Sequence, residues 1–145
     1  MIIDNIGIVV ESIDNVIPFF ETIGLKLEGR QVIEGEWAGR LTGVEDQVVE
    51  IAMLSSGDQQ TRVELSQFIK PALHAKHRKD PVNTQGYLRI MFKVPNMDEL
   101  LMKLVLFGVE IVGDVVEYQN TFKLCYLRGP EGILIGLAEE INSLN

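Results

Sequence analysis

The chain has 145 residues, of which 46% are hydrophobic, and its formal net charge is −8. This length suits one domain or two small halves that share a core. The acidic balance argues against nucleic acid or an anionic membrane as the main partner, and no apolar run reaches the roughly 20 residues of a membrane span. A lone cysteine, Cys125, excludes an internal disulfide. With no export signal in view, we expect a cytoplasmic protein.

The first segment, residues 2–29, predicts a strand followed by a helix. Apolar residues alternate from Ile6 to Val10, which indicates a strand with one buried face. Apolar positions then recur at helical spacing up to Gly24, a residue suited to the positive φ of a helix end.

Three strands and a loop are expected before the middle of the chain. The strands fall at residues 25–32, 47–54 and 61–69. Residues 34–43 are rich in glycine and charge and predict a loop or an irregular strand edge, which carries the only tryptophan, Trp37. Residues 70–85 hold two prolines and both histidines and predict a linker.

The second half of the chain repeats the first. A shift of 84 places brings residues 5–29 onto residues 89–113, with apolar residues on apolar residues and glycines on glycines. Asn96 is suited to cap the second helix, and Gly108 to end it. Three further strands are expected at Glu110–Tyr118, Phe122–Arg128 and residues 133–138.

The predicted fold class is therefore α+β, with two βαβββ modules. Residues 1–69 form the first module, residues 70–85 the linker, and residues 86–145 the second module. We expect one face of each first strand to pack on a helix, with these residues buried: Ile6, Ile8, Val10, Leu88, Ile90, Phe92, Phe20 and Leu104.

Five motifs occur in order along the chain: DNIGIVVES (4–12), FFETIGL (19–25), VELSQF (63–68), GYLRIMFKV (86–94) and RGPEGILIGLAE (128–139). In this order they resemble the vicinal oxygen chelate superfamily, which contains glyoxalase I, bleomycin-resistance proteins, extradiol dioxygenases and methylmalonyl-CoA epimerase. The resemblance implies two βαβββ modules that form a curved mixed sheet around a cleft, with the helices outside and a divalent metal at the bottom. It also implies modules that pair within one chain or between chains.

The superfamily's metal positions fall, by this resemblance, on Asn5, Glu64, Arg89 and Gly136. Only Glu64 keeps the usual ligand type. The guanidinium of Arg89 stays protonated and has no acceptor, and Gly136 has no side chain. Hard cations need more oxygen donors than one carboxylate and one amide, and zinc or nickel would need imidazole or thiolate. A divalent metal is therefore not supported by the ligand set, and the cofactor is left unknown.

Two interpretations of Glu64 and Arg89 stay open, because the resemblance places them across the cleft from each other. In one, they form a salt bridge that closes a degenerate site. In the other, Arg89 binds a carboxylate or phosphate of a ligand through its planar donors, while Glu64 positions Arg89 or acts as a catalytic base. The missing side chain of Gly136 would leave room on the cleft floor for such a ligand.

Three more residues are candidates for ligand binding. Glu50 lies in the middle of an apolar strand, where its carboxylate faces either water at an edge or the cleft. Trp37 and Tyr126 are either packing residues or aromatic side chains that line the cleft. Asn5 completes the set of candidate ligand-binding residues.

The remaining chemistry-bearing residues have simpler interpretations. Arg40 and Arg128 could add positive charge to the cleft or form surface ion pairs. His74 and His77 are three residues apart, but a solvated linker explains them better than a two-histidine metal site. Cys125, in an apolar strand, is expected to be a small buried residue.

Three function classes follow. The first is a glyoxalase-type lyase or isomerase acting on a small anionic or thiol-conjugated ligand. The second is a non-catalytic protein that sequesters a small molecule, as bleomycin-resistance proteins do. The third is a structural protein with a vestigial cleft, against which the polar Asn5, Glu64 and Arg89 argue. We expect a homodimer, because modules of this superfamily pair and strand edges need covering.

Overall fold

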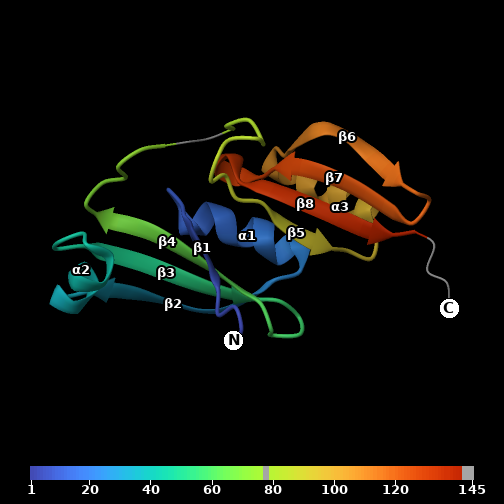
Figure 1. Cartoon of the computed structure of the whole chain (residues 1–145). Coiled ribbons are helices and arrows are strands. Elements are labelled where there is room, and N and C mark those ends of the chain that lie inside the picture. The colour runs from blue at the N-terminus through green and yellow to red at the C-terminus, as the bar shows by residue number, and fades with distance from the viewer. Residues whose placement is uncertain (77–78, 142–145) are drawn as a thin grey trace. The chain divides into compact units, whose positions relative to one another are not determined.

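The computed structural model describes residues 1–76 and 79–141. Its chain divides into two compact units, Met1–Lys76 and His77–Asn145. Each unit contains a four-stranded mixed sheet and a helix that packs against it (Figure 1). The predicted α+β fold with two βαβββ modules is confirmed.

The first unit consists of β1 (Ile6–Val9), α1 (Ile13–Ile23), β2 (Lys26–Glu34), α2 (Glu36–Thr42), β3 (Val48–Ser55) and β4 (Arg62–Lys70). Its strands lie in the order β1-β4-β3-β2. The β1 strand runs parallel to β4, and the other pairs are antiparallel.

The second unit repeats this arrangement with β5 (Ile90–Lys93), α3 (Met97–Leu104), the 3-10 turn η1 (Val105–Phe107), β6 (Glu110–Tyr118), β7 (Phe122–Arg128), the 3-10 turn η2 (Pro130–Gly132) and β8 (Leu134–Glu140). Its strands lie in the equivalent order, β5-β8-β7-β6, with β5 parallel to β8.

The sequence repeat corresponds to repeated helix caps. The Ser12 hydroxyl accepts from the Asn15 amide at the start of α1, and the Asn96 side chain accepts from the Glu99 amide at the start of α3. Both first strands are followed by a glycine-ended helix segment, at Gly24 with φ 128° and Gly108 with φ 66°. These caps satisfy backbone groups that a helix end leaves unpaired.

The last strand of each unit also holds its helix by a side chain. The Ile13 amide donates to Gln67 Oε1 of β4 at 2.8 Å, and the Met97 amide donates to Glu139 Oε2 of β8 at 2.8 Å. Each helix N-terminus is thereby fixed over the strand that is parallel to the first strand of its unit.

Each unit has its own apolar core between helix and sheet. The predicted burial is confirmed for Val10, Phe20 and Leu104, but Leu88 is 66% exposed. The other predicted core residues of the two first strands, Ile6, Ile8, Ile90 and Phe92, are only half-buried. Leu88 was expected in a strand, yet β5 begins only at Ile90. Core side chains that are fully buried include Ile13, Phe19, Phe20, Leu54 and Leu65 in the first unit and Met97, Leu104, Leu127, Ile135 and Leu137 in the second.

The prediction of a loop or an irregular strand edge at residues 34–43 was wrong in one respect, because Glu36–Thr42 forms a helix, α2. The helix ends at Gly43, whose amide donates to the Gly39 carbonyl at 2.7 Å. Its buried side is made of its two smallest residues, Ala38 and Gly39. Within residues 1–76 and 79–141, no helix combines the length and apolar character needed to cross a membrane.

Candidate ligand-binding site

The face of the first sheet that lies opposite α1 carries a mixed set of side chains. Because side chains alternate along a strand and paired residues share a face, the register fixes which residues lie together. Glu64 pairs with Met53 and Gly7, Ser66 with Ile51, and Phe68 with Val49. We call this surface the inner face of the first unit.

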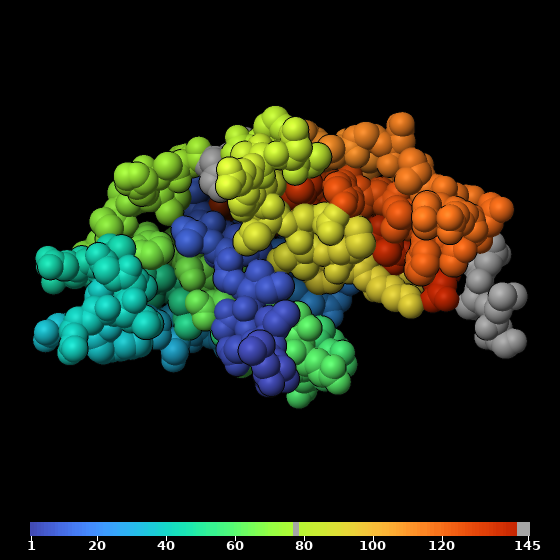
Figure 2. Space-filling model, viewed as in Figure 1, coloured from blue at the N-terminus to red at the C-terminus, as the bar shows by residue number. Residues whose placement is uncertain are grey.

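The α2 helix covers one end of this inner face and closes a pocket, which we call the inner pocket. Its volume is about 250 Å³. In Figure 2, α2 and the adjoining loop are coloured cyan and lie at one end of the first unit, at the left of the view. The lining residues come from β2, α2, β3 and β4, and from Gln47, which directly precedes β3. They are Ile33, Trp37, Ala38, Leu41, Thr42, Gln47, Val49, Ile51, Glu64, Ser66 and Phe68.

The α2 helix presents large apolar side chains to this pocket while leaving them accessible. Trp37 is 58% exposed and Leu41 76% exposed, although both line the pocket. Exposed aromatic and aliphatic groups of this kind are typical of ligand sites, since a ligand completes their burial.

One hydrogen bond and the close packing of two small residues hold α2 in place. The Thr42 hydroxyl donates to Gln47 Oε1, and Gln47 itself is only 4% exposed. Ala38 is fully buried. A Cβ on Gly39 would lie 3.0 Å from the Val44 carbonyl oxygen and 3.3 Å from Glu45 Cα. The absence of a side chain at Gly39 therefore lets α2 pack closely on the loop that follows it.

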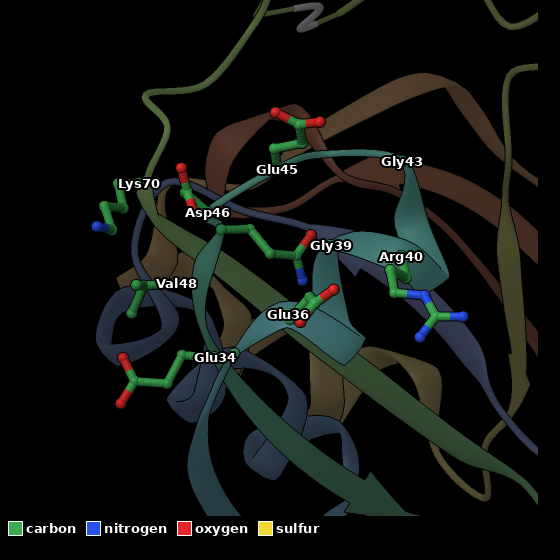
Figure 3. Close-up of a pocket in the computed structure, with 11 residues that line it drawn as sticks. Glu34, Glu36, Gly39, Arg40, Gly43, Glu45, Asp46, Val48 and Lys70 are labelled. Carbon is green, nitrogen blue, oxygen red and sulfur yellow. The ribbon is translucent and has the colours of Figure 1, made fainter.

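A second, larger cavity lies beside α2 and is strongly acidic. It measures about 800 Å³, and its lining includes the carboxylates of Glu34, Glu36, Glu45 and Asp46. Figure 3 shows the Arg40 and Lys70 side chains extending away from Glu36 on opposite sides. The surroundings of α2 thus carry an excess of negative charge.

The second unit has a turn at residues 119–121 where the first unit has α2. On its equivalent face, the guanidinium carbon of Arg89 lies 4.7 Å from the ring centroid of Tyr126. A Cβ on Gly136 would lie 2.7 Å from Cε of Met91 and 3.4 Å from Cδ of Arg89. The room expected at Gly136 is therefore filled, because Met91 and Arg89 occupy it.

The superfamily's metal ion does not fit these residues. Asn5 and Glu64 in the first unit provide one amide oxygen and one carboxylate, fewer oxygen donors than a hard cation needs. In the second unit, Arg89 is a cation and Met91 fills the space at Gly136. Among the described residues, no group of three or more histidine, cysteine, aspartate or glutamate side chains is placed to hold a metal.

Glu50 lies on the face opposite to Glu64. It pairs with Val32 and Gln67, and the guanidinium of Arg30 donates to its carboxylate, at 2.7 Å from Nε. Arg30 also donates to Asp14 of α1 at 2.6 Å. The bond to Asp14, and next the bond to Glu50, raise the pKa of Arg30. Glu50 is thus part of an ion-pair network on the helix side of the sheet.

Other candidates have structural roles in their own units. Arg128, weighed as a cleft cation or a surface pair, is only 7% exposed and donates to the Tyr87 hydroxyl and the Asp80 carbonyl. His74 is exposed, and His77 lies outside the described residues. Glu64 and Arg89 belong to different units, so their pairing stays a prediction.

The structure therefore brings Glu64 and Trp37 into one pocket, and Arg89 and Tyr126 into one cation–π pair. Sequence reasoning missed Leu41, Ile51, Ser66 and Phe68. A signal was available for Leu41, because Trp37 and Leu41 are four residues apart and share a helical face. The others follow from the alternation of β3 and β4 once Glu64 is placed.

A family model for the Glyoxalase/Bleomycin resistance protein/Dioxygenase superfamily matches residues 4–126. The crystal structure of a glyoxalase family protein from Bacillus cereus is 57% identical to this chain, with a TM-score of 0.94, over 98% of this chain and 95% of that one. No curated protein sequence matches significantly. The chain belongs to the glyoxalase/bleomycin resistance/dioxygenase superfamily.

More distant structures share the fold. One is a trypanothione-dependent glyoxalase I from Leishmania major, 21% identical with a TM-score of 0.64 over 94% of this chain and 84% of that one. Another is an antibiotic binding protein from Streptomyces sp. CB03234, 17% identical with a TM-score of 0.59 over 97% of this chain and 96% of that one. The fold thus occurs in both an enzyme and a binding protein.

Proposed function

We propose that this protein binds a small, largely apolar molecule in the inner pocket, and that binding does not depend on a metal ion. The observation that carries the proposal is the inner pocket itself, where α2 places Trp37 and Leu41 over the face that bears Glu64. The antibiotic binding protein of Streptomyces shows that this fold is used for binding in another protein.

The metal positions support the same proposal. A ligand set without imidazole or thiolate, and with one carboxylate, favours a function that needs no Lewis acid. The pocket does not depend on those positions, apart from Glu64. We therefore place binding ahead of metal-assisted chemistry.

A lyase or isomerase that acts on a small anionic or thiol-conjugated ligand is the second candidate. The observation in its favour is that the Glu64 carboxylate lines the pocket, where it could accept a proton from a bound substrate. Such an enzyme would convert its ligand, whereas a sequestering protein would release it unchanged. Mass spectrometry of the ligand after prolonged incubation separates the two.

Trp37 allows a direct test, because it is the only tryptophan and lines the pocket. Protein stripped of metal with a chelator is titrated with small aromatic molecules, and tryptophan fluorescence is followed alongside calorimetry. We expect saturable binding with the same dissociation constant in chelator and in added zinc, nickel or magnesium.

The metals alone are expected to raise the melting temperature little. Tight native-state binding would instead stabilise the fold by roughly 2.7 kcal/mol at a hundredfold excess over the dissociation constant. A large metal-dependent stabilisation that disappears in Glu64→Ala, or ligand binding that requires metal, would overturn the proposal.

A further inference from the structure

We propose that the inner pocket selects cationic ligands: molecules in which a protonated amine is attached to an aromatic or otherwise apolar body. This inference rests on the proposed function, since it names the class of molecule that the same pocket takes. It is argued from the charge, polar contacts and shape of the pocket.

Among the described residues that line the inner pocket, Glu64 is the only ionisable one. Its hydrogen-bond partner there is the Ser66 hydroxyl, which donates to Oε1 at 3.4 Å, a long hydrogen bond. No lysine or arginine of the described first unit pairs with it. The other polar groups are neutral, and Thr42 and Gln47 are bonded to each other.

A ligand that enters this pocket removes water from the Glu64 carboxylate. Without a compensating partner, this desolvation opposes binding, because a buried charge needs a counter-charge or hydrogen-bond donors. A ligand ammonium supplies both, through a charge-assisted hydrogen bond. A neutral ligand supplies less, and a ligand carboxylate adds repulsion.

The acidic cavity beside α2 adds to this preference. Its carboxylates at Glu34, Glu36, Glu45 and Asp46 lie next to the same helix that covers the inner pocket. Arg40 and Lys70 also line this cavity, so the four carboxylates leave a net excess of negative charge. Such an excess raises the local concentration of cations and lowers that of anions. The whole chain, with a net charge of −8, acts in the same direction.

The remaining lining determines the body of the ligand. Trp37 and Phe68 offer aromatic faces, and Leu41 and Ile51 offer aliphatic contacts. Aromatic faces attract both flat apolar groups and cations. The volume of about 250 Å³ lies just below the range of roughly 300–1,000 Å³ that is usual for ligand pockets, so the ligand is a small molecule.

The test uses three probes with one common body: 1-naphthylmethylamine, 1-naphthalenemethanol and 1-naphthaleneacetic acid. Binding is measured by calorimetry at neutral pH and moderate salt. We expect the amine to bind the parent protein about tenfold or more tightly than the alcohol, and the carboxylate to bind most weakly. In Glu64→Gln, which keeps size and polarity, the amine and the alcohol should bind within about twofold of each other.

Glu45→Gln is the matched control. It makes the same change in net charge, but Glu45 lines the acidic cavity and not the inner pocket. It should retain most of the amine preference. If it abolished the preference as fully as Glu64→Gln does, the selectivity would come from the general field, and the assignment to Glu64 would be overturned.

Two other outcomes distinguish an error in the cationic class from an error in the proposed function. If all three probes bind the parent protein with similar affinity, and Trp37 fluorescence reports their entry, the pocket binds ligands but the cationic class is wrong. If no probe binds, both the cationic class and the proposed function are wrong. Circular dichroism of each variant checks that the fold is intact.

Discussion

The guanidinium carbon of Arg89 lies over the Tyr126 ring, 4.7 Å from its centroid. A cation–π contact uses the face of the ring and no oxygen acceptor, so the N–H donors of Arg89 can still bind an oxyanion. The contact also limits the rotamers of Arg89, which reduces the entropy that a ligand would have to overcome.

The anion-binding interpretation of Arg89 therefore has a direct test. In a thermal-shift screen of small carboxylates, phosphates and thiol conjugates, we expect Arg89→Met to weaken binding of any anionic hit by about 1.5–3 kcal/mol. Arg89→Lys should recover only part of the loss, because the planar fork of donors is missing.

Lys93→Met serves as the control for Arg89→Met. It removes a cation from β5, the strand that begins directly after Arg89, but the Lys93 ammonium already pairs with Glu140 at 2.9 Å. If Arg89→Met binds every anionic hit as well as the parent does, Arg89 is a structural residue and the anion interpretation is wrong.

Cys125 provides a prediction about pH. The thiol is 2% exposed, and burial raises its pKa above the ordinary value, although Lys123 acts in the opposite direction. A raised native pKa favours the neutral thiol. Its contribution to stability is thus complete below the pKa of the unfolded thiol, about 8.5, and is lost as pH rises through the higher native value.

Iodoacetamide should therefore modify Cys125 slowly in the native protein at pH 8 and rapidly in urea, since the thiolate is the reactive form. The native rate should continue to rise at pH values where the unfolded rate has levelled off. Intact-mass measurements over time give both rates. Equal rates in the native and unfolded protein would show that the site is open and that its pKa is ordinary.

At the scale of elements, the strands were predictable where the apolar pattern was regular. The bounds of β6 and β7 agree with the prediction, and the repeated Gly29 and Gly113 both lie at register shifts of the second strand in their units. The α2 helix was not predictable by the same logic, because a helix of seven residues with an internal glycine has little intrinsic stability. Its packing on the inner face makes it a helix.

This dependence on packing makes Gly39 a sensitive position. A Cβ there would meet backbone atoms of Val44 and Glu45, which cannot move aside as a side-chain tip can. We expect Gly39→Ala to cost about 1–3 kcal/mol of stability through overpacking and to weaken ligand binding in the inner pocket by displacing Trp37.

The matched substitution is Gly57→Ala, because a Cβ at Gly57 meets nothing within 4 Å. Chemical denaturation gives the two stabilities, and Trp37 fluorescence reports the position of α2. A Gly39→Ala protein with parental stability and parental fluorescence would mean that the contact with residues 44 and 45 relaxes at no cost.

For the whole molecule, the duplication was readable because it preserves the positions that end helices and bend strands. The candidate site was only partly readable. The family pattern placed Glu64 on the cleft side of its sheet, but the pocket depends on α2, and the described chain between β6 and β7, the equivalent connection, forms only a turn. An alignment of the two halves of the sequence detects only the positions that both halves share. It therefore could not detect α2, which lies in the connection where the two units differ.

We predict that the protein self-associates. Each open sheet has two edge strands, and β6, at one edge, exposes Ile111, Val115, Val116 and Tyr118. Exposed apolar edges are usually covered by another chain or element. We expect sedimentation velocity to show a homodimer at micromolar concentration. A single monomeric species under those conditions would reject the prediction.

The filled space at Gly136 bears on the design of a metal site in the second unit. A glutamate introduced there would displace the Met91 methyl group, which is the tip of a flexible side chain, and would bring a carboxylate close to the Arg89 guanidinium, with which it can form an ion pair. A histidine introduced at position 89 alone would find no carboxylate at position 136. Two metal ligands at positions 89 and 136 therefore require both substitutions together.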